Sequence, residues 1–570
     1  MNHKALAFSM IALLPIVVAC HQGKQIEVAK SSPPTKSAIT SSMTATATIA
    51  PNRPILWQKG PASAHNGPAE RPPNIVFILA DDLGINDIST FGGGVADGKV
   101  PTPNIDRLAK QGAMFTQGYA GNATCAPSRA MLMTGRYSTR TGYEYTPTRP
   151  GFGRMVAKWG NEMDNNLPEY TYDAELDKTK PHYDDMGLPA SEITIAELLK
   201  PRGYHNVHIG KWHLGNENGS HPADQGFDES LLMDDLLHLP EDSPNVVNAK
   251  LEFDPIDKTL WTISKFGTTY RTSADGPDKP RSKFEPGGYL ADYWTDEALK
   301  VIDNNKHRPF FLYLAHWGPH TPLQATKEDY EAVGDIKPHR LRVYAAMIRS
   351  IDRSVGRVMQ KLEDEGLADN TIVVFSSDNG GAGYLGLPGV NSPYRGWKIS
   401  FFEGGIRAPL FVKWPAKIAA ETKIDTPVAH IDVMPTLAAA AQAELPKGVA
   451  IDGKNLLPLA MGTGSITRKN DALFWQSGYL KVVRASNWKM IYEGKRDKYW
   501  LFNLKNDPTE QTNLVDKNSE KLIELKAILA EHQADAKPPL YPTTTSSPIM
   551  IDKTMAERYE EGDEFVWWPN

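Results

Sequence analysis

Cysteine is scarce in this chain of 570 residues, which contains only Cys20 and Cys125. A chain of this length buries enough apolar surface to fold without disulfides, so we expect none, and each cysteine is free for a special role. A strong charge of either sign is also lacking, since the formal net charge is −6. This small value predicts no nucleic-acid partner. It does not exclude an anionic substrate, because the charge inside a pocket can oppose that of the whole molecule.

The apolar run near the N-terminus is too short to cross a bilayer as an ordinary helix. It covers residues 5–19, follows Lys4 and is typical of a secretory signal. The run ends in Val17-Val18-Ala19-Cys20, which resembles the lipobox of bacterial lipoproteins. That resemblance implies that residues 1–20 are a signal peptide with Cys20 as the lipidated residue, and that the chain is exported to the periplasm or outer membrane. The alternative is a signal anchor with an incidental cysteine.

The chain divides into segments of different composition. Residues 21–73 are rich in Ser, Thr, Pro and Ala, which predicts a flexible tether, although Leu56 and Trp57 are bulky enough to dock on the folded body. The remaining part, about 500 residues, suits one large and one smaller domain. A change of pattern near Gly448 predicts a catalytic domain over residues 74–447 and a C-terminal subdomain with a tail over residues 448–570.

Short apolar runs alternate with helical patterns in the larger part. Residues 74–80, 310–315 and 371–377 read as strands buried on both faces, and residues 339–366 have the apolar spacing of a helix. This alternation predicts an α/β fold, with a large, mainly parallel (mixed) sheet flanked by helices on both faces. After residue 448 the runs become short and strand-like, which predicts a smaller α+β domain with an antiparallel sheet.

Polar clusters directly follow two of these strands. They are Asp81-Asp82 and Asp378-Asn379. Sheets of this class bind ligands beyond the carboxyl ends of their strands, so we expect these side chains to converge. Their oxygen atoms suit a hard cation such as Ca²⁺ or Mg²⁺ better than zinc. Each cluster taken alone is more often a turn after a strand, and the metal hypothesis depends on the residues described next.

The segment around the second cysteine is the most specific in the chain. Cys125-Ala126-Pro127-Ser128-Arg129, followed by Thr134-Gly135-Arg136, resembles the signature of the type I sulfatases of the alkaline phosphatase-like superfamily. The resemblance implies that a formylglycine-generating or anaerobic sulfatase-maturing enzyme oxidises Cys125 to formylglycine, whose hydrate is the nucleophile. It also implies that Asp81, Asp82, Asp378 and Asn379 bind Ca²⁺, in preference to Mg²⁺, together with residue 125. A buried free thiol is the alternative.

Further segments match the family in order along the chain. Gly210-Lys211-Trp212-His213-Leu214-Gly215 implies that Lys211 and His213 contact the nucleophile, and residues two apart on a strand point to one face. Pro319-His320-Thr321-Pro322 resembles the segment with the leaving-group histidine. His316 at the same strand end is a rival for that role and otherwise a pocket or core histidine.

Lys398 resembles the family's lysine that binds a sulfate oxygen. The family often has Gly-Gly-Lys where this chain has Gly396-Trp397-Lys398, so Trp397 is a local departure. Glu403 and Arg407, slightly further on, are expected to be structural, as a turn and an ion pair of little energetic consequence if exposed.

The resemblance assigns a role to each of these groups. A sulfate monoester is an anion, so its oxygens must be neutralised before a nucleophile approaches, which suits Lys211, Lys398, Arg129 and a cation. One formylglycine hydroxyl would attack sulfur, with Asp378 orienting its proton, while His320 and Lys398 assist the departing alcohol. His213 would then deprotonate the second hydroxyl and release sulfate from a sulfated enzyme.

The sequence says less about the substrate. Residues 151–189 and 240–286 are long and loop-like, with aromatic and charged side chains that suit either sugar binding or packing of the loops. The apolar tail Phe565-Val566-Trp567-Trp568 is expected to dock, near the pocket rim. A sulfated carbohydrate is the favoured substrate. The alternatives are an arylsulfatase, a phosphonate monoester or phosphodiester hydrolase, or a non-catalytic lipoprotein that binds sulfated glycans.

Overall fold

The computed structural model describes residues 49–63, 71–277, 279 and 281–570. The predicted signal, Cys20 and most of the predicted tether lie outside these residues. Ile49–Asn570 form a compact unit. Among the described helices, none is both long enough and apolar enough to span a membrane.

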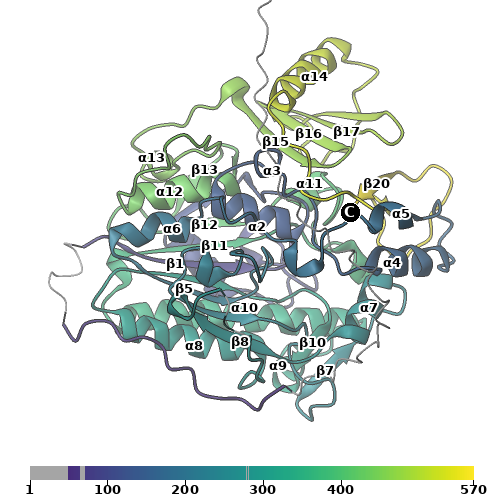
Figure 1. Cartoon of the computed structure of the whole chain (residues 1–570). Coiled ribbons are helices and arrows are strands. Elements are labelled where there is room, and N and C mark those ends of the chain that lie inside the picture. Colours follow the sequence, from purple (N-terminus) through teal and green to yellow (C-terminus); the bar gives the residue numbers. More distant parts are fainter. Residues whose placement is uncertain (1–48, 64–70, 278, 280) are drawn as a thin grey trace, which may run out of the picture. The chain divides into compact units, whose positions relative to one another are not determined.

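A nine-stranded mixed sheet forms the centre of the unit, in the order β13-β2-β12-β11-β1-β9-β5-β6-β8 (Figure 1). The five neighbouring strands from β11 to β6 are parallel, whereas β12 and β8 run antiparallel to the strands beside them. The predicted mainly parallel sheet is therefore confirmed. The strands are β1 Asn74–Ala80, β2 Ala113–Phe115, β5 His205–Gly210, β6 Glu229–Met233, β8 Thr268–Thr272, β9 Phe310–Ala315, β11 Thr371–Ser377, β12 Leu410–Lys413 and β13 Thr422–Ile424.

Helices cover both faces of this sheet, as predicted. Alternate residues of β1 enter two separate cores, because side chains along a strand point to opposite faces. Val76 and Ile78 pack with α8 (Leu290–Asn305) and α10 (His339–Asp364). Ile75, Phe77 and Leu79 pack with α2 (Cys125–Thr134), α6 (Ile195–Leu199) and α12 (Val433–Ala440). Figure 1 shows α8 and α10 on one side of the sheet and α6 and α12 on the other.

The smaller sheets complete the predicted α+β part. Strands β15 (Ala472–Ser477), β16 (Leu480–Ala485), β17 (Trp488–Glu493) and β18 (Lys498–Asn503) form an antiparallel sheet covered by α14 (Ser519–Gln533). A further sheet joins β4 (Thr171–Tyr172), β19 (Thr545–Met550) and β20 (Phe565–Pro569). The apolar tail therefore docks by strand pairing. The boundary at residue 448 stays a prediction.

Parts of the predicted loops are regular structure. Residues 151–189 contain α4 (Phe152–Asn161) and α5 (Ala174–Asp177), and residues 240–286 contain β7 (Val246–Ala249), α7 (Pro255–Ile263) and β8. The loop prediction was wrong there because these elements are short. The signal for α7 was nevertheless in the sequence, since Asp254 accepts hydrogen bonds from the first turn and Pro255 occupies its first position.

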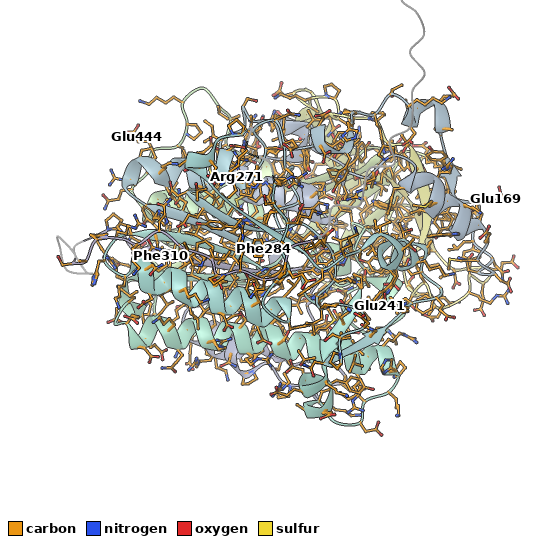
Figure 2. The ribbon with its side chains drawn as sticks, turned by 60° about the horizontal axis from the view of Figure 1, so that its bottom comes forward. Glu169, Glu241, Arg271, Phe284, Phe310 and Glu444 are labelled. Atoms are coloured by element: carbon orange, nitrogen blue, oxygen red, sulfur yellow. The ribbon has the colours of Figure 1, made fainter. Side chains whose placement is uncertain are left out.

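The end of the predicted tether is packed against the unit. Trp57 is buried and its Nε1 donates to Glu297 Oε2 at 2.6 Å, whereas Leu56 is 87% exposed. Docking was thus correct for Trp57 and wrong for Leu56. Figure 2 gives the same contrast elsewhere, with Phe284 and Phe310 inside the unit and Glu169 and Glu444 at its surface.

The remaining helices and strands are short. They are α1 Pro103–Lys110, β3 Gly118–Tyr119, α3 Ser138–Thr141, β10 Leu323–Thr326, α9 Lys327–Ala332, α11 Glu403–Ile406, β14 Val428–Ala429 and α13 Leu457–Ala460.

Candidate active site

The two polar clusters meet because β1 and β11 are parallel neighbours. Ala80 pairs with Ser377, so the residues that follow each strand leave the same edge of the sheet. Asp81, Asp82, Asp378 and Asn379 are all buried, and Asp82 N donates to Asp378 Oδ1 at 3.2 Å. Burial and the neighbouring Asp378 raise the pKa of Asp81 to about 7, which reflects the cost of crowding carboxylates without water.

Cys125 lies against these carboxylates at the first residue of α2. Its Sγ is 3.6 Å from Asp81 Oδ1 and 3.8 Å from Asp82 Oδ1. Burial raises the pKa of the thiol, and the charges of Asp378 and Asp81 raise it further. An unmodified Cys125 would therefore stay protonated at neutral pH, which makes it a poor thiolate nucleophile.

Arg129 lies one turn further along α2 and is fully buried beneath the carboxylates. Its Nε donates to Asp378 Oδ2 at 2.8 Å and its Nη2 to Asp81 Oδ2 at 2.9 Å. Its Nη1 donates to the backbone oxygen of Lys211 at 2.7 Å. The sequence predicts that Arg129 helps to neutralise the sulfate oxygens. In the structure its hydrogen bonds join three segments of the site, and Arg129 is not among the residues that line the cavity described below.

Lys211 and His213 both line the cavity above Cys125, although not as strand residues. Strand β5 ends at Gly210, and His213 has a left-handed backbone with φ of 65°. The expectation that both sit on a strand was wrong, and the turn brings them to one place instead. Lys211 Nζ lies 2.5 Å from Asp81 Oδ2, an ion pair without hydrogen-bond geometry. His213 Nδ1 is buried and has no hydrogen-bond partner in the described part of the chain.

Lys398 approaches the carboxylates from another segment. Its Nζ donates to Asp82 Oδ2 at 2.7 Å and to Tyr384 Oη at 3.0 Å. Tyr384 Oη in turn donates to Asp82 Oδ2 at 2.7 Å. Sequence reasoning missed Tyr384, because a tyrosine after a glycine-rich turn carries no signal of its own. The structure explains the tryptophan at position 397, where the family often has glycine. Trp397 Nε1 donates to the backbone oxygen of Met550 in β19 at 2.8 Å, which anchors the segment beside Lys398.

Buried ion pairs fix the segment that carries Lys398. Glu403 accepts a hydrogen bond from Arg407 Nε at 2.7 Å and one from Lys489 Nζ of β17 at 2.8 Å. Lys489 also pairs with Glu510 at 2.8 Å, and both Lys489 and Glu403 have no exposed surface. The Glu403–Arg407 pair predicted from sequence is therefore present, and it is buried instead of exposed. Lys489, which pairs with Glu403, joins the Lys398 segment to the C-terminal sheet.

The structure places the two rival histidines in different surroundings. His320 lines the cavity, stacks on Trp317 with ring centroids 4.0 Å apart, and has its Nε2 3.5 Å from Asp82 Oδ2. His316 is turned toward α10, where its Nε2 lies 2.9 Å from Ser354 Oγ. His316 does not line the cavity, so it is a core histidine.

These side chains fit a hard divalent cation. The ligand atoms of Asp81, Asp82, Cys125 and His320 lie within 4.8 Å of one another, and within this group the two carboxylates supply the oxygens that a hard ion prefers. Asn379 Nδ2 donates to Asp82 Oδ1 at 2.7 Å, and Asn379 Oδ1 is buried without a hydrogen-bond partner among the described residues. An orphaned amide oxygen beside carboxylates is a suitable ligand for such an ion. Each oxygen of Asp378 also accepts a hydrogen bond, one from Arg129 and one from the backbone of Asp82.

A cavity of about 330 Å³ opens above this cluster. Its lining has a polar part and an apolar part. Cationic and imidazole groups lie beside Cys125, and aliphatic and aromatic groups line the rest. Trp568 of the C-terminal tail also lines it, so the tail docks at the pocket, as the sequence predicted. The residues around Cys125 are Lys211, His213, His320, Tyr384 and Lys398.

The fold and site together are those of the alkaline phosphatase-like enzymes, and the comparisons with known proteins narrow the class. The sulfatase family model matches residues 73–443, and a model described as N-sulphoglucosamine sulphohydrolase, C-terminal, matches residues 396–535. The chain belongs to the sulfatase family and is a sulfuric ester hydrolase.

Relatives of known function share much of the chain. Steryl-sulfatase of Mus musculus is 31% identical over 77% of this chain and 73% of its own length. N-acetylgalactosamine-6-sulfatase of Homo sapiens is 33% identical over 68% of this chain and 66% of its own length. The solved structure of Ps i-CgsB in complex with k-i-k-neocarrahexaose is 29% identical, with a TM-score of 0.65, and covers 83% of this chain and 95% of its own.

Proposed function

We propose that this protein hydrolyses sulfate monoesters of a carbohydrate, with formylglycine formed from Cys125 as the nucleophile and Ca²⁺ held by the surrounding carboxylates. One observation carries the proposal. Cys125 lies within 3.8 Å of Asp81 and Asp82 at a cavity that Lys211, Lys398, His213 and His320 also line. Formylglycine would supply a hydrated aldehyde with two hydroxyl groups, and the cation would supply a Lewis acid beside the sulfate oxygens.

The protein's own cations would bind the anionic sulfate. Lys211 and Lys398 flank Asp81 and Asp82, so their ammonium groups lie beside the nucleophile and can turn to a ligand in the cavity. Cys125 begins α2, and the N-terminal end of a helix of ten residues adds positive potential at the same place. Arg129 would keep Asp81 and Asp378 in position. This charge is fixed before the substrate arrives, which is how electrostatic catalysis is most effective.

The two histidines would move protons. Burial lowers the pKa of His213, and the nearby Lys211 lowers it further, so His213 is a neutral base able to accept a proton from the nucleophile. Burial and Lys398 lower the pKa of His320 in the same way. His320 Nδ1 donates to the Thr321 oxygen at 2.6 Å, so its Nε2 is the atom that would carry a proton to the leaving alcohol. Binding of an anionic sulfate offsets the field of the lysines and favours the protonated form.

A carbohydrate substrate is supported by the names of related proteins, which include N-acetylgalactosamine-6-sulfatase and a structure containing neocarrahexaose. Membership of an enzyme family argues against the non-catalytic alternative. An arylsulfatase remains the second candidate, favoured by the aliphatic side chains of the cavity. The phosphonate monoester hydrolase of Agrobacterium radiobacter is only 18% identical, with a TM-score of 0.53, and so shares the fold alone.

Replacing the nucleophile tests the proposal. We expect Cys125→Ala to abolish sulfate release from sulfated oligosaccharides and from 4-nitrophenyl sulfate, because the attacking group is lost. Mass analysis of the peptide containing residue 125 should show the aldehyde in active wild-type protein. Full turnover by Cys125→Ala, or an intact thiol in active protein, would falsify the mechanism.

Removal of the cation provides an independent test. Dialysis against a chelator should lower turnover at least about 100-fold, since the carboxylates would then repel the sulfate instead of holding a Lewis acid. Ca²⁺ should restore activity better than Mg²⁺, because a site of several protein oxygens suits the larger ion. Unchanged turnover after chelation, with metal analysis showing no bound ion, would exclude this role.

We further propose that Cys20, which lies outside the described residues, anchors the protein to a membrane as a lipoprotein of the periplasm or outer membrane. The lipobox-like sequence supports this proposal. Replacing Cys20 with Ala should move the protein from the membrane fraction to the soluble fraction; unchanged fractionation would contradict the anchor.

A further inference from the structure

One part of the cavity is apolar and is built from segments far apart in the sequence. Ile256, Leu260 and Ile263 all line the cavity from α7. Their spacing of four and three residues puts them on one face of that helix. Phe152 at the start of α4 and Trp568 of β20 line the same cavity. We call these five residues the apolar wall.

The charged side chains of the cavity are mostly paired with each other. Arg281 Nη1 lies 3.1 Å from Asp234 Oδ1, and Lys283 Nζ lies 3.2 Å from Asp235 Oδ2. Arg281 Nε also lies 3.1 Å from Glu217 Oε1. These groups therefore satisfy one another and leave the apolar wall as the larger source of binding energy for the part of the substrate beyond the sulfate.

Strand pairing fixes the direction of Trp568. It pairs with Ser547 of β19, and neighbouring residues on a strand point to opposite faces. Trp567 accordingly points elsewhere, with Lys495 Nζ 3.4 Å from its ring centroid, and it does not line the cavity. The two adjacent tryptophans thus differ in position while sharing the same strand.

We propose that the apolar wall is the leaving-group subsite, and that Trp568 selects alcohols carrying a rigid ring with an apolar face. This inference rests on the proposed sulfatase function and adds the feature that the substrate must present. The wall offers a single hydrogen-bond donor, Trp568 Nε1, which is buried without a partner among the described residues. The rest of its surface is apolar, so it favours a surface that gives up little hydration when it is buried. Two leaving groups share this chemistry, the C–H face of a pyranose ring and the face of a flat polycyclic alcohol.

The test compares Trp568→Ala with Trp567→Ala on three substrates. These are a sulfated oligosaccharide, a polycyclic aryl sulfate and 4-nitrophenyl sulfate, whose single ring covers little of the wall. For Trp568→Ala we expect KM to rise at least about tenfold on one of the two larger substrates, with kcat within about threefold, as for loss of a buried aromatic contact. The rise in KM on 4-nitrophenyl sulfate should be smaller, because its one small ring covers less of the wall.

The pattern of effects decides the outcome. A selective rise with the oligosaccharide identifies the sugar face, and a selective rise with the polycyclic sulfate identifies the flat alcohol. Equal changes on all three substrates, or none, would overturn the inference. Trp567→Ala should have a KM within about threefold of the wild-type value. Trp568→Phe should restore most of the affinity lost in Trp568→Ala, which would show that the loss does not come from misfolding. If the wild type releases no sulfate from any substrate, the proposed function fails instead.

Discussion

At the scale of single residues, two histidines that follow β9 lie only four positions apart, yet one lines the cavity and the other lies in the core. Both follow the same strand, and both imidazoles are buried. The Nε2 of His320 lies in the cavity beside Asp82, whereas the Nε2 of His316 forms a hydrogen bond with Ser354 of α10. Their replacement should therefore have different consequences for catalysis.

Asparagine substitutions test this difference. We expect His320→Asn to lower kcat about 100-fold or more on an alkyl or sugar sulfate, because the leaving alcohol loses its proton donor. The loss should be smaller on 4-nitrophenyl sulfate, whose leaving group needs little protonation. His316→Asn should change kcat less than about threefold and cost about 1 kcal/mol of stability through its hydrogen bond. Equal loss of kcat in both variants would show that the histidines were assigned wrongly.

Single residues also mark the limit of sequence reasoning. Cys125, Lys211 and His320 could be found because each stands in a long, specific segment. Tyr384 could not be found, because its contribution depends on where a turn comes to lie. For Trp568 the sequence predicted docking of the tail near the pocket, but not the strand pairing that directs this side chain into it. Arg129 was found, but its partners were not, since the sequence does not reveal that its guanidinium donates to three buried groups.

At the scale of elements, the segment carrying Lys398 depends on a different sheet. Glu403 at the start of α11 shares Lys489 of β17 with Glu510, and all three side chains are fully buried. Removing one partner from a buried ion pair leaves an uncompensated charge, which is much more costly than loss of an exposed pair. The junction between α11 and β17 should therefore be sensitive to substitution.

We expect Lys489→Met to lower the free energy of unfolding by about 3 kcal/mol, because Glu403 and Glu510 lose their shared cation. The matched control is Lys469→Met, which breaks an exposed pair with Glu531 whose side chains are 75% and 52% exposed. That variant should lose less than about 0.5 kcal/mol. Denaturant titration of both proteins measures the difference, and equal losses would contradict the role of burial.

The long, periodic elements could be predicted, and the short ones could not. Strand β1 is fully buried, so its sequence is a continuous apolar run, and α10 has 26 residues with regular apolar spacing. Helix α7 has nine residues and β4 has two, which is too little for a period to show. The apolar wall was therefore hidden, since it depends on elements of this size and on the pairing of β20.

At the scale of the whole molecule, buried neutral histidines link stability to pH. Burial is the largest cause that lowers the pKa of His316, His430 and His532 to about 4, and that of His208 and His238 to about 3. An unfolded histidine has a pKa of about 6.5. Below that pH these five histidines bind more protons in the unfolded chain than in the native protein, so their contribution to native stability falls as the pH decreases.

Buried carboxylates with a raised pKa, such as Asp81, oppose the effect of the histidines over the same pH range, so the test compares the melting temperatures of a variant and of the wild type. Each histidine contributes up to about 1.4 kcal/mol per pH unit in that range. His532→Gln removes one of these five histidines. Its native stability should therefore fall less with decreasing pH than that of the wild type, by the contribution of one bound proton. If the melting temperatures of His532→Gln and of the wild type change in parallel from pH 6.5 to 4.5, His532 is not held neutral in the native protein.

The segment at residues 49–60 has a practical consequence for anyone shortening the chain. Ala50 N donates to the Lys283 oxygen at 3.2 Å, and Lys283 lines the cavity. Trp57 and Ile55 are buried further along the same segment. A shortened protein that begins at Asn74, where the first strand starts, would lose the hydrogen bond that holds Lys283 at the cavity. Expression designs should therefore keep every residue from Ile49 onward.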